Sequence, residues 1–426
     1  MGQSNLHQVR FPPHYSFRLR LFALLAASAT LSAACGAGGA GPSDNTLLVG
    51  AVYPLSGSQA EGGRQELAGL RTALELAGGR QLKLQVEPVQ TPEGARAAVD
   101  RLIDRSHASI IVGTYGSTLA EAAAARADER HVIYWETGAV ADLVTQHRRY
   151  VFRTVATGSS LGRIAVNFTS RVLLPAAGLQ PTQARAVIVN VSDVYGRAVA
   201  DGEEQLAAAT GIPVVSRIQY DPNAYSATDI AQQVWASQAD YLWDVSYIAD
   251  GIDIWQAILA RGVKLRAAVG TSSAFCMAAF GRTLGAQAVG VFAADKPDDQ
   301  VNPDALSPAA RELLGRAKAA YAKQQLGSDM PIPAVAGFVG GWTLLHEVLP
   351  YVKGQVTPDA VREAAYRLDE PAGTSINGGG VKFAGPGELD AGQNLRAPAV
   401  VGQWQAVDTM KAVYPAAFAR AKPIVP

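Results

Sequence analysis

Ala186-Val-Ile-Val-Asn-Val191 is a run of apolar residues broken by a single amide, and a helical pattern follows it over residues 197–209. A continuous apolar run of this length is typical of a strand that is buried on both faces of a sheet. A further strand pattern, residues 212–217, comes directly after the helix. Because parallel strands need a crossover connection, this order of elements predicts a strand-helix-strand unit in a parallel sheet.

The same alternation of strand and helix patterns extends in both directions along the chain. Strand patterns occupy residues 47–52, 82–86, 110–112, 132–135 and 150–152 before this unit, and residues 241–245, 265–269 and 289–293 after it. The two series predict an α/β fold with two lobes, whose parallel sheets are covered by helices on both faces. Ligands of open α/β sheets bind beyond the carboxyl ends of the strands, so two facing lobes predict one shared cleft.

The composition and the motifs exclude several classes of function. Lys and Arg together number 37, and Asp and Glu together also number 37, so no net charge attracts nucleic acid. The sequence contains no nucleophile elbow, no HExxH, no paired-cysteine metal motif and no phosphate-binding loop, and its six histidines are scattered. We therefore expect a protein that is not an enzyme and that uses no metal and no cofactor. We also expect it to be a monomer.

The first residues of the chain are typical of a bacterial export signal. The apolar segment from Leu21 to Ala34 is shorter than the ~20 residues that a membrane-spanning helix needs. Cys35 follows small residues and resembles a lipobox cysteine, which receives a lipid and becomes the mature N-terminus. We expect residues 1–34 to be a signal peptide and residues 35–45 a lipid-anchored flexible leash. The alternative is an ordinary secretory signal with an incidental cysteine, and both place the protein outside the cytoplasm, in the periplasm or on the outer face of the cell membrane.

Several motifs resemble, in their order and spacing, those of one family of binding proteins. They include Gly50-Ala-Val-Tyr-Pro-Leu-Ser-Gly, Ile111-Val-Gly-Thr-Tyr-Gly-Ser117 and Gly270-Thr-Ser-Ser273. The family is that of the periplasmic substrate-binding proteins of ABC transporters for branched-chain amino acids, amides and urea. The resemblance implies a type I periplasmic binding fold, in which two Rossmann-like lobes are joined by a hinge of three strands.

The resemblance also implies a division into lobes and a function. We expect lobe 1 to contain residues 46–155 and 297–376, and lobe 2 to contain residues 156–296 and 377–426. The implied function is that of an extracytoplasmic lipoprotein that captures a small polar organic solute of the amino-acid, amide, urea or aromatic-acid class. Closure about the hinge would bury the solute, and the transmembrane subunits of an ABC permease would receive it. The alternative is a sensor of the same fold that reports the solute to a membrane receptor.

Matched residue by residue, the resemblance implies that two turns of lobe 1 bind a carboxylate group of the ligand. Ser117 matches a serine that holds this carboxylate, and Ser117 and Thr118 begin a predicted helix, whose free N–H groups favour an anion. Gly138 and Ala139 match a second turn, in which backbone amides contact the carboxylate. The alternative role for Ser117 is that of a helix cap.

The resemblance further implies contacts from lobe 2. Tyr195 and Tyr247 match aromatic residues that close over the ligand, although a tyrosine at a strand end is as often part of a core. Ser272 stands where amino-acid binders carry the glutamate that pairs with the ligand ammonium. A buried ammonium without a partner is costly, so either another acid replaces this glutamate or the ligand has no α-ammonium. Glu136 and Asp244 are the candidate replacements, and the alternative role for each is that of a surface or cap carboxylate.

Overall fold

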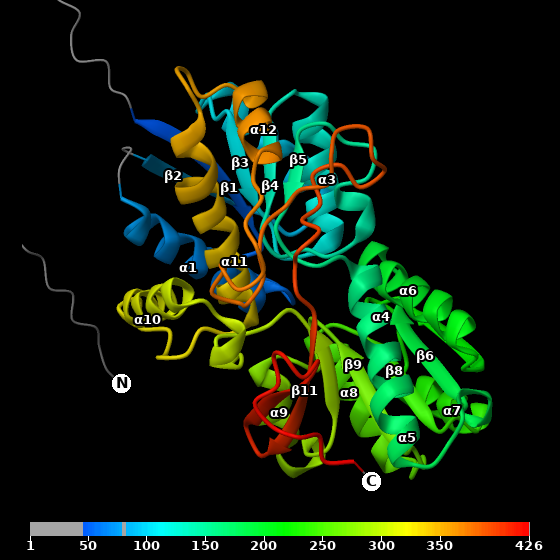
Figure 1. Cartoon of the computed structure of the whole chain (residues 1–426). Helices are drawn as coiled ribbons and strands as arrows, with labels where there is room; N and C mark the ends of the chain where they lie inside the picture. The colour runs from blue at the N-terminus through cyan, green and yellow to red at the C-terminus, as the bar shows by residue number, and fades with distance from the viewer. Residues whose placement is uncertain (1–45, 79–81, 426) are drawn as a thin grey trace, which may run out of the picture. The chain divides into compact units, whose positions relative to one another are not determined.

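The computed structural model describes residues 46–78 and 82–425. The described residues belong to one compact unit, Thr46–Pro426, in which Figure 1 shows two groups of strands and helices that we call lobe 1 and lobe 2. The predicted signal peptide, Cys35 and the leash lie outside the described residues.

Lobe 1 is built on a parallel sheet of five strands in the order β2-β1-β3-β4-β5. The strands are β1 (Leu47–Tyr53), β2 (Leu82–Pro88), β3 (Ile110–Gly113), β4 (Ile133–Glu136) and β5 (Val151–Arg153). The helices of this lobe are α1 (Ala60–Ala77), α2 (Pro92–Asp104), α3 (Ser117–Glu129), α10 (Pro308–Ala322), α11 (Ile332–Trp342) and α12 (Pro358–Tyr366). Every residue of β3 and β4 is buried, as expected for strands that helices cover on both faces.

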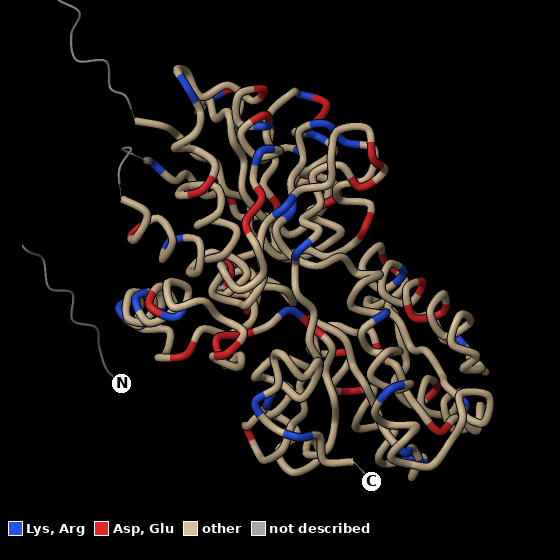
Figure 2. Tube along the Cα trace, viewed as in Figure 1, with Lys and Arg blue, Asp and Glu red and all other residues tan. Residues whose placement is uncertain are grey.

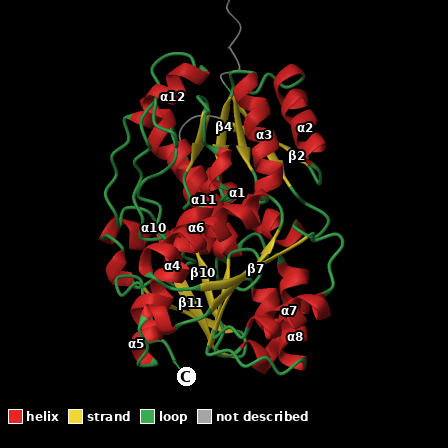
Figure 3. Cartoon of the chain, turned by 90° about the vertical axis from the view of Figure 1, so that its right-hand side faces the viewer, coloured by secondary structure: helices red, strands yellow, loops and turns green. Residues whose placement is uncertain are grey.

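Lobe 2 is built on a sheet of seven strands in the order β12-β11-β10-β9-β8-β6-β7. The strands are β6 (Ala186–Val191), β7 (Val214–Tyr220), β8 (Tyr241–Val245), β9 (Ala267–Thr271), β10 (Phe292–Asp295), β11 (Val400–Ala406) and β12 (Thr409–Tyr414). The helices are α4 (Gly158–Phe168), α5 (Leu174–Ala176), α6 (Val194–Thr210), α7 (Ala227–Ser237), α8 (Ile248–Ala260) and α9 (Ala278–Leu284). Figure 3 shows the strands of each lobe between helices, so the predicted two-lobed α/β architecture is confirmed.

The last two strands differ from the purely parallel sheets that we expected. β11 pairs antiparallel with both β10 and β12. Only Val407 and Asp408 connect β11 to β12, and a connection of two residues can join only antiparallel neighbours. The positive φ of Asp408, 55°, suits the tight turn of such a hairpin.

The chain passes between the lobes after β5, after β10 and shortly before β11. Val381 and Phe383 pack in the hydrophobic cluster of lobe 1, although we expected residues 377–426 to belong to lobe 2. The ring of Phe383 lies edge-on to Trp135 and Phe152, with centroids 5.4 and 5.1 Å apart. Burial of this aromatic surface holds the segment on lobe 1, so the third crossing lies later than the predicted boundary.

One helical segment in the described part of the chain, Ile332–Tyr351, is long and apolar enough to cross a membrane, but 83% of its most apolar window is buried inside the protein. It packs against α1, where two glycines allow the helices to approach closely. A Cβ atom at Gly69 would lie 1.9 Å from the carbonyl oxygen of Ala334, and one at Gly337 would lie 2.0 Å from that of Glu66. The apolar composition of this segment therefore serves the core of lobe 1.

Candidate ligand-binding site

A small cavity lies where the carboxyl ends of strands from both lobes meet. Its volume in this conformation is only about 10 Å³, within about 240 Å³ of space that is partly open to solvent. The residues that line it follow β3 and β4 in lobe 1, β6, β8 and β9 in lobe 2, and β10 at a crossing between the lobes. They are Tyr115, Gly116, Ser117, Gly138, Val140, Tyr195, Tyr247, Ser272, Ser273 and Lys296. This position agrees with the general rule for ligand sites in α/β sheets, and the cavity contains five of the eight predicted ligand-binding residues.

Ser117 begins helix α3 and its side chain faces the second turn of lobe 1. Its Oγ accepts hydrogen bonds from the backbone N–H groups of Val140 and Ala141, at 3.2 and 3.1 Å. A hydroxyl has two acceptor lone pairs and one donor, so these two bonds leave the hydroxyl proton of Ser117 for a further acceptor. The N–H groups in the first turn of α3 have no partner within the helix. The Ser117 hydroxyl and these N–H groups are the hydrogen-bond donors that lobe 1 contributes at this side of the cavity.

The Gly138–Ala139 turn binds a carboxylate that belongs to the chain itself. The N–H groups of Gly138 and Ala139 both donate to Oε1 of Glu136, at 2.7 and 2.7 Å. The other oxygen, Oε2, accepts from the N–H of Thr114 and from the hydroxyl of Tyr134, each at 3.0 Å. Glu136 is fully buried and does not line the cavity, and its burial raises its pKa to about 7. Glu136 therefore organises the turns that surround the ligand space.

A second buried carboxyl group, Glu66 of α1, lies directly beneath the same turn. Its Oε1 accepts a hydrogen bond of 2.5 Å from Thr137 Oγ1, which also contacts the hydroxyl of Tyr53 at 2.9 Å. Its Oε2 has no hydrogen-bond partner among the described residues. Burial, together with the neighbouring charge of Glu136, holds the pKa of Glu66 well above its usual range. Sequence patterns gave no sign of this residue, because it sits mid-helix on a face that reads as core.

Two tyrosines form the wall of the cavity in lobe 2. Tyr195 donates a hydrogen bond of 2.6 Å to the carbonyl oxygen of Thr271, and Tyr247 donates one of 2.5 Å to Oδ2 of Asp193. Their ring centroids are 5.4 Å apart. Because both hydroxyl groups already donate within the protein, the rings offer mainly apolar surface to a ligand.

Lys296 follows β10 and reaches the cavity from the crossing segment. Its Nζ lies 3.0 Å from Asp295 Oδ1 and 3.4 Å from the carbonyl oxygen of Gly138. It therefore joins a residue of the crossing to the carboxylate-binding turn of lobe 1. Sequence reasoning missed Lys296, since its only signal was a charged pair immediately after a buried strand.

Neither Ser272 nor Asp244 places a carboxylate in the cavity. Ser272 lines the cavity with a positive φ of 48°, a conformation that non-glycine residues seldom adopt. Asp244 is fully buried in β8, accepts a hydrogen bond from Ser246, and does not line the cavity. Burial raises the pKa of Asp244 to about 8.

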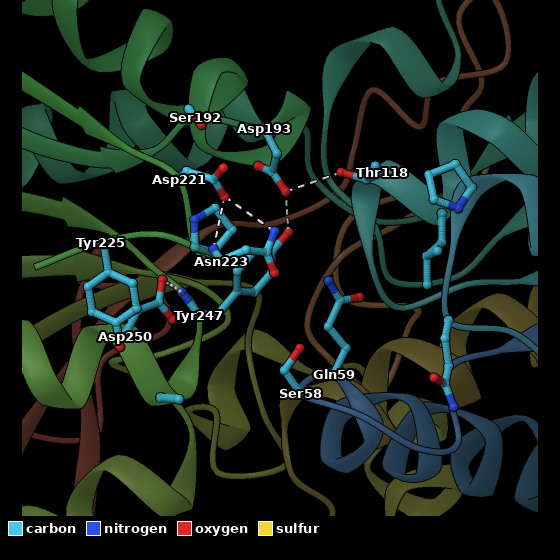
Figure 4. A pocket seen from close by; sticks show the side chains of 15 residues that line it. Ser58, Gln59, Thr118, Ser192, Asp193, Asp221, Asn223, Tyr225, Tyr247 and Asp250 are labelled. Atoms are coloured by element: carbon cyan, nitrogen blue, oxygen red, sulfur yellow. Dashed lines mark hydrogen bonds between the residues drawn. The ribbon is translucent and has the colours of Figure 1, made fainter.

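Outside the cavity the cleft widens into a mouth of about 480 Å³, which is lined mostly by polar residues. Figure 4 shows Gln59 and Thr118 of lobe 1 on one side and Asp193 and Asn223 of lobe 2 on the other. Thr118 donates a hydrogen bond of 3.1 Å to Oδ2 of Asp193. Thr118 thus ties the two lobes together at the edge of the cavity and does not line the cavity itself.

Comparisons with known proteins identify relatives along most of the chain. A family model for periplasmic binding proteins matches residues 46–405. Leu/Ile/Val-binding protein homolog 8 of Brucella abortus (strain 2308) is 30% identical over 381 residues, which cover 88% of this chain and 91% of the relative. Leu/Ile/Val-binding protein homolog 7 of Brucella suis biovar 1 is 26% identical over 398 residues, which cover 91% of this chain and 96% of the relative.

Solved structures of solute-binding proteins share the fold. The leucine-binding protein LivK of Thermotoga maritima has a TM-score of 0.72 at 16% identity, covering 86% of this chain and 97% of that chain. A solute-binding protein of an ABC transporter from R. palustris in complex with benzoate has a TM-score of 0.71 at 18% identity, covering 89% and 98%. LivJ of Streptococcus pneumoniae in complex with isoleucine has a TM-score of 0.68 at 18% identity, covering 87% and 100%.

Proposed function

The chain belongs to the periplasmic binding protein family, and from that premise we propose that it captures a small organic solute and delivers it to the transmembrane subunits of an ABC permease. Members of this family are extracytoplasmic binding proteins and not enzymes. The observation that carries the proposal is the cavity itself, whose lining comes from both lobes and from one crossing segment. Basic and acidic residues are interspersed along the trace of both lobes in Figure 2, which supports a small ligand rather than a nucleic acid.

Hinge closure accounts for how such a cavity captures its ligand. Lobe 1 offers the Ser117 proton and the first-turn amides of α3, and lobe 2 then covers the ligand with Tyr195 and Tyr247. In the described conformation the lobes are joined by the bond from Thr118 to Asp193. A permease that binds only the closed form would distinguish loaded from empty protein.

A thermal-shift screen of the mature protein tests this proposal. We expect at least one member of a panel of amino acids, amides, urea and aromatic acids to raise the melting temperature, because a ligand that binds only the native state must stabilise it. A ligand at 100 times its Kd adds about 2.7 kcal/mol to the free energy of unfolding. A panel without any stabilising member, at millimolar concentrations, would contradict the proposed function.

The proposal includes a lipid anchor on Cys35. The leash of residues 36–45 would then keep the binding lobes near the permease at the membrane surface. We expect the wild-type protein to fractionate with membranes and the Cys35→Ser variant to be released or to remain unprocessed. Mass spectrometry of the mature N-terminus checks this, and an unmodified N-terminus at any other residue would rule the anchor out.

A further inference from the structure

Among the described residues that line the small cavity, Lys296 alone carries a charge. Its side chain is 8% exposed, so its ammonium group is held in a mostly dehydrated environment. It lines the same cavity as Ser117, the first residue of α3. The formal charge among the described lining residues is therefore that of one ammonium group, which Asp295 pairs with at 3.0 Å.

The ion pair of Lys296 leaves its charge available to the cavity. An ammonium group has three N–H donors, and the contacts with Asp295 and with the Gly138 carbonyl account for two of them. The carboxylate of Asp295 is engaged elsewhere, since Oδ1 also accepts from the Lys296 backbone and Oδ2 accepts from the thiol of Cys276, both at 2.7 Å. Asp295 does not line the small cavity. The cation, and not its partner, therefore lines the cavity.

No carboxylate stands where it could pair with a cationic ligand inside the cavity as the structure describes it. The described lining contains serines, tyrosines, glycines, a valine and Lys296, but no Asp or Glu. Asp193, at the mouth, already accepts from Thr118, Tyr247 and the N–H of Gly196. An α-ammonium group would thus lose its hydration beside a like charge, whereas a carboxylate would gain a charge-assisted partner.

We infer that the ligand is a small carboxylate without an α-ammonium group, and that Lys296 is the residue that selects its charge. This inference rests on the proposed function of a solute-binding protein. The rings of Tyr195 and Tyr247 suit an apolar, aromatic or branched body attached to that carboxylate. The carboxylate itself lies between Lys296 and the donors of Ser117 and α3.

Two matched pairs of compounds test the charge of the ligand. Benzoate and benzamide share a ring and differ in charge, and 4-methyl-2-oxopentanoate and leucine share a carbon skeleton and differ in the α-ammonium group. Calorimetric titration of the mature wild-type protein should show one of the two acids bound at least tenfold more tightly than its matched partner. Tighter binding of leucine or of benzamide would overturn the inference but leave the proposed function intact. Absence of binding by all four compounds, while an amino acid, an amide or urea of the thermal-shift panel binds, would overturn the inference alone. Only a panel without any stabilising member would count against both.

Variants of Lys296 test which residue selects the charge. We expect Lys296→Met to weaken binding of the preferred acid by about 10- to 100-fold, the range for loss of a charge-assisted hydrogen bond. The variant should also discriminate less between this acid and its matched neutral or zwitterionic compound. Because Lys296→Met leaves Asp295 unpaired and could impair folding, the double variant Asp295→Asn/Lys296→Met removes both charges. Lys296→Arg should retain most of the preference.

Lys318→Met is the matched control for loss of a paired lysine. Lys318 pairs with Asp299 at 2.8 Å and does not line the cavity, so its loss should leave the affinity and the charge preference unchanged. An equal loss of affinity for both members of a pair in the Lys296 variants would indicate a structural role and overturn the assignment.

Discussion

Replacement of Glu136 by glutamine should lower the free energy of unfolding by about 1–3 kcal/mol, because one buried backbone donor loses its acceptor. Four donors converge on this carboxylate, the N–H groups of Gly138, Ala139 and Thr114 and the hydroxyl of Tyr134. Glutamine keeps one acceptor oxygen and turns an amide NH₂ towards two of these donors. The Tyr134 hydroxyl can rotate to accept, but a backbone N–H cannot. Urea unfolding of the wild-type and variant proteins measures the difference.

Glu347→Gln is a control with the same chemical change and a similar pKa. Burial raises the pKa of Glu347 to about 7, as it does for Glu136. However, Oε2 of Glu347 has no partner among the described residues, so an amide at this position displaces no donor. We expect Glu347→Gln to change the free energy of unfolding by less than about 1 kcal/mol. Equal destabilisation by the two variants would mean that burial, and not the set of four donors, decides the cost.

The raised pKa of Glu136 also predicts the sign of a pH effect. Between the ordinary value of 4.5 and about 7, the folded protein holds a proton at Glu136 that the unfolded chain has released. The free energy of unfolding therefore falls as the pH rises through this range, and the proton contributes full stability below it. The Glu136→Gln variant should show a shallower decline between pH 5 and pH 7.5 in calorimetric melting. An unchanged decline would assign the effect to other buried carboxyl groups.

The sequence was sufficient for the architecture because the strands are short, apolar and separated by amphipathic helices. It also located the turns around the cavity, since strand ends in parallel sheets converge on one edge. The individual residues Ser117, Gly138, Tyr195, Tyr247 and Ser272, which all line the cavity, came from the resemblance to the binding-protein family.

Individual contacts could not be predicted from the sequence, because they depend on how segments that are distant in the chain pack against one another. The sequence shows an acidic residue, Glu136, at the end of β4. It does not show that the following turn folds back so that the N–H groups of Gly138 and Ala139 donate to the Glu136 carboxylate. Lys296 and Glu66 approach the same turn from a crossing segment and from α1. No local pattern encodes such a meeting. Likewise, the segment around Phe383 has no strand or helix signal. Aromatic packing, together with backbone hydrogen bonds between Arg153 and residues 392 and 394, holds it on lobe 1.

Gly138→Ala should weaken both stability and ligand binding. A Cβ atom at Gly138 would lie 1.8 Å from Oε2 of Glu66 and 2.4 Å from its Cδ. Glu66 is fully buried and bonded to Thr137, so it cannot swing into solvent to make room. Overpacking of this kind costs about 1–3 kcal/mol of unfolding free energy. Since the Gly138 carbonyl also contacts Lys296, we expect a loss of affinity of about tenfold or more for the acid that the wild-type protein prefers.

Gly315→Ala supplies the matched control for adding one methyl group. Gly315 lies within helix α10 and a Cβ atom there would meet nothing within 4 Å. Alanine is a better helix former than glycine, so this variant should gain up to about 1 kcal/mol and bind ligand as the wild type does. Urea unfolding and calorimetric titration of the two variants separate stability from affinity. If Gly138→Ala binds ligand with wild-type affinity, the turn can shift without disturbing the ligand. The 1.8 Å approach of a Cβ atom to Glu66 Oε2 would then have no effect on the cavity.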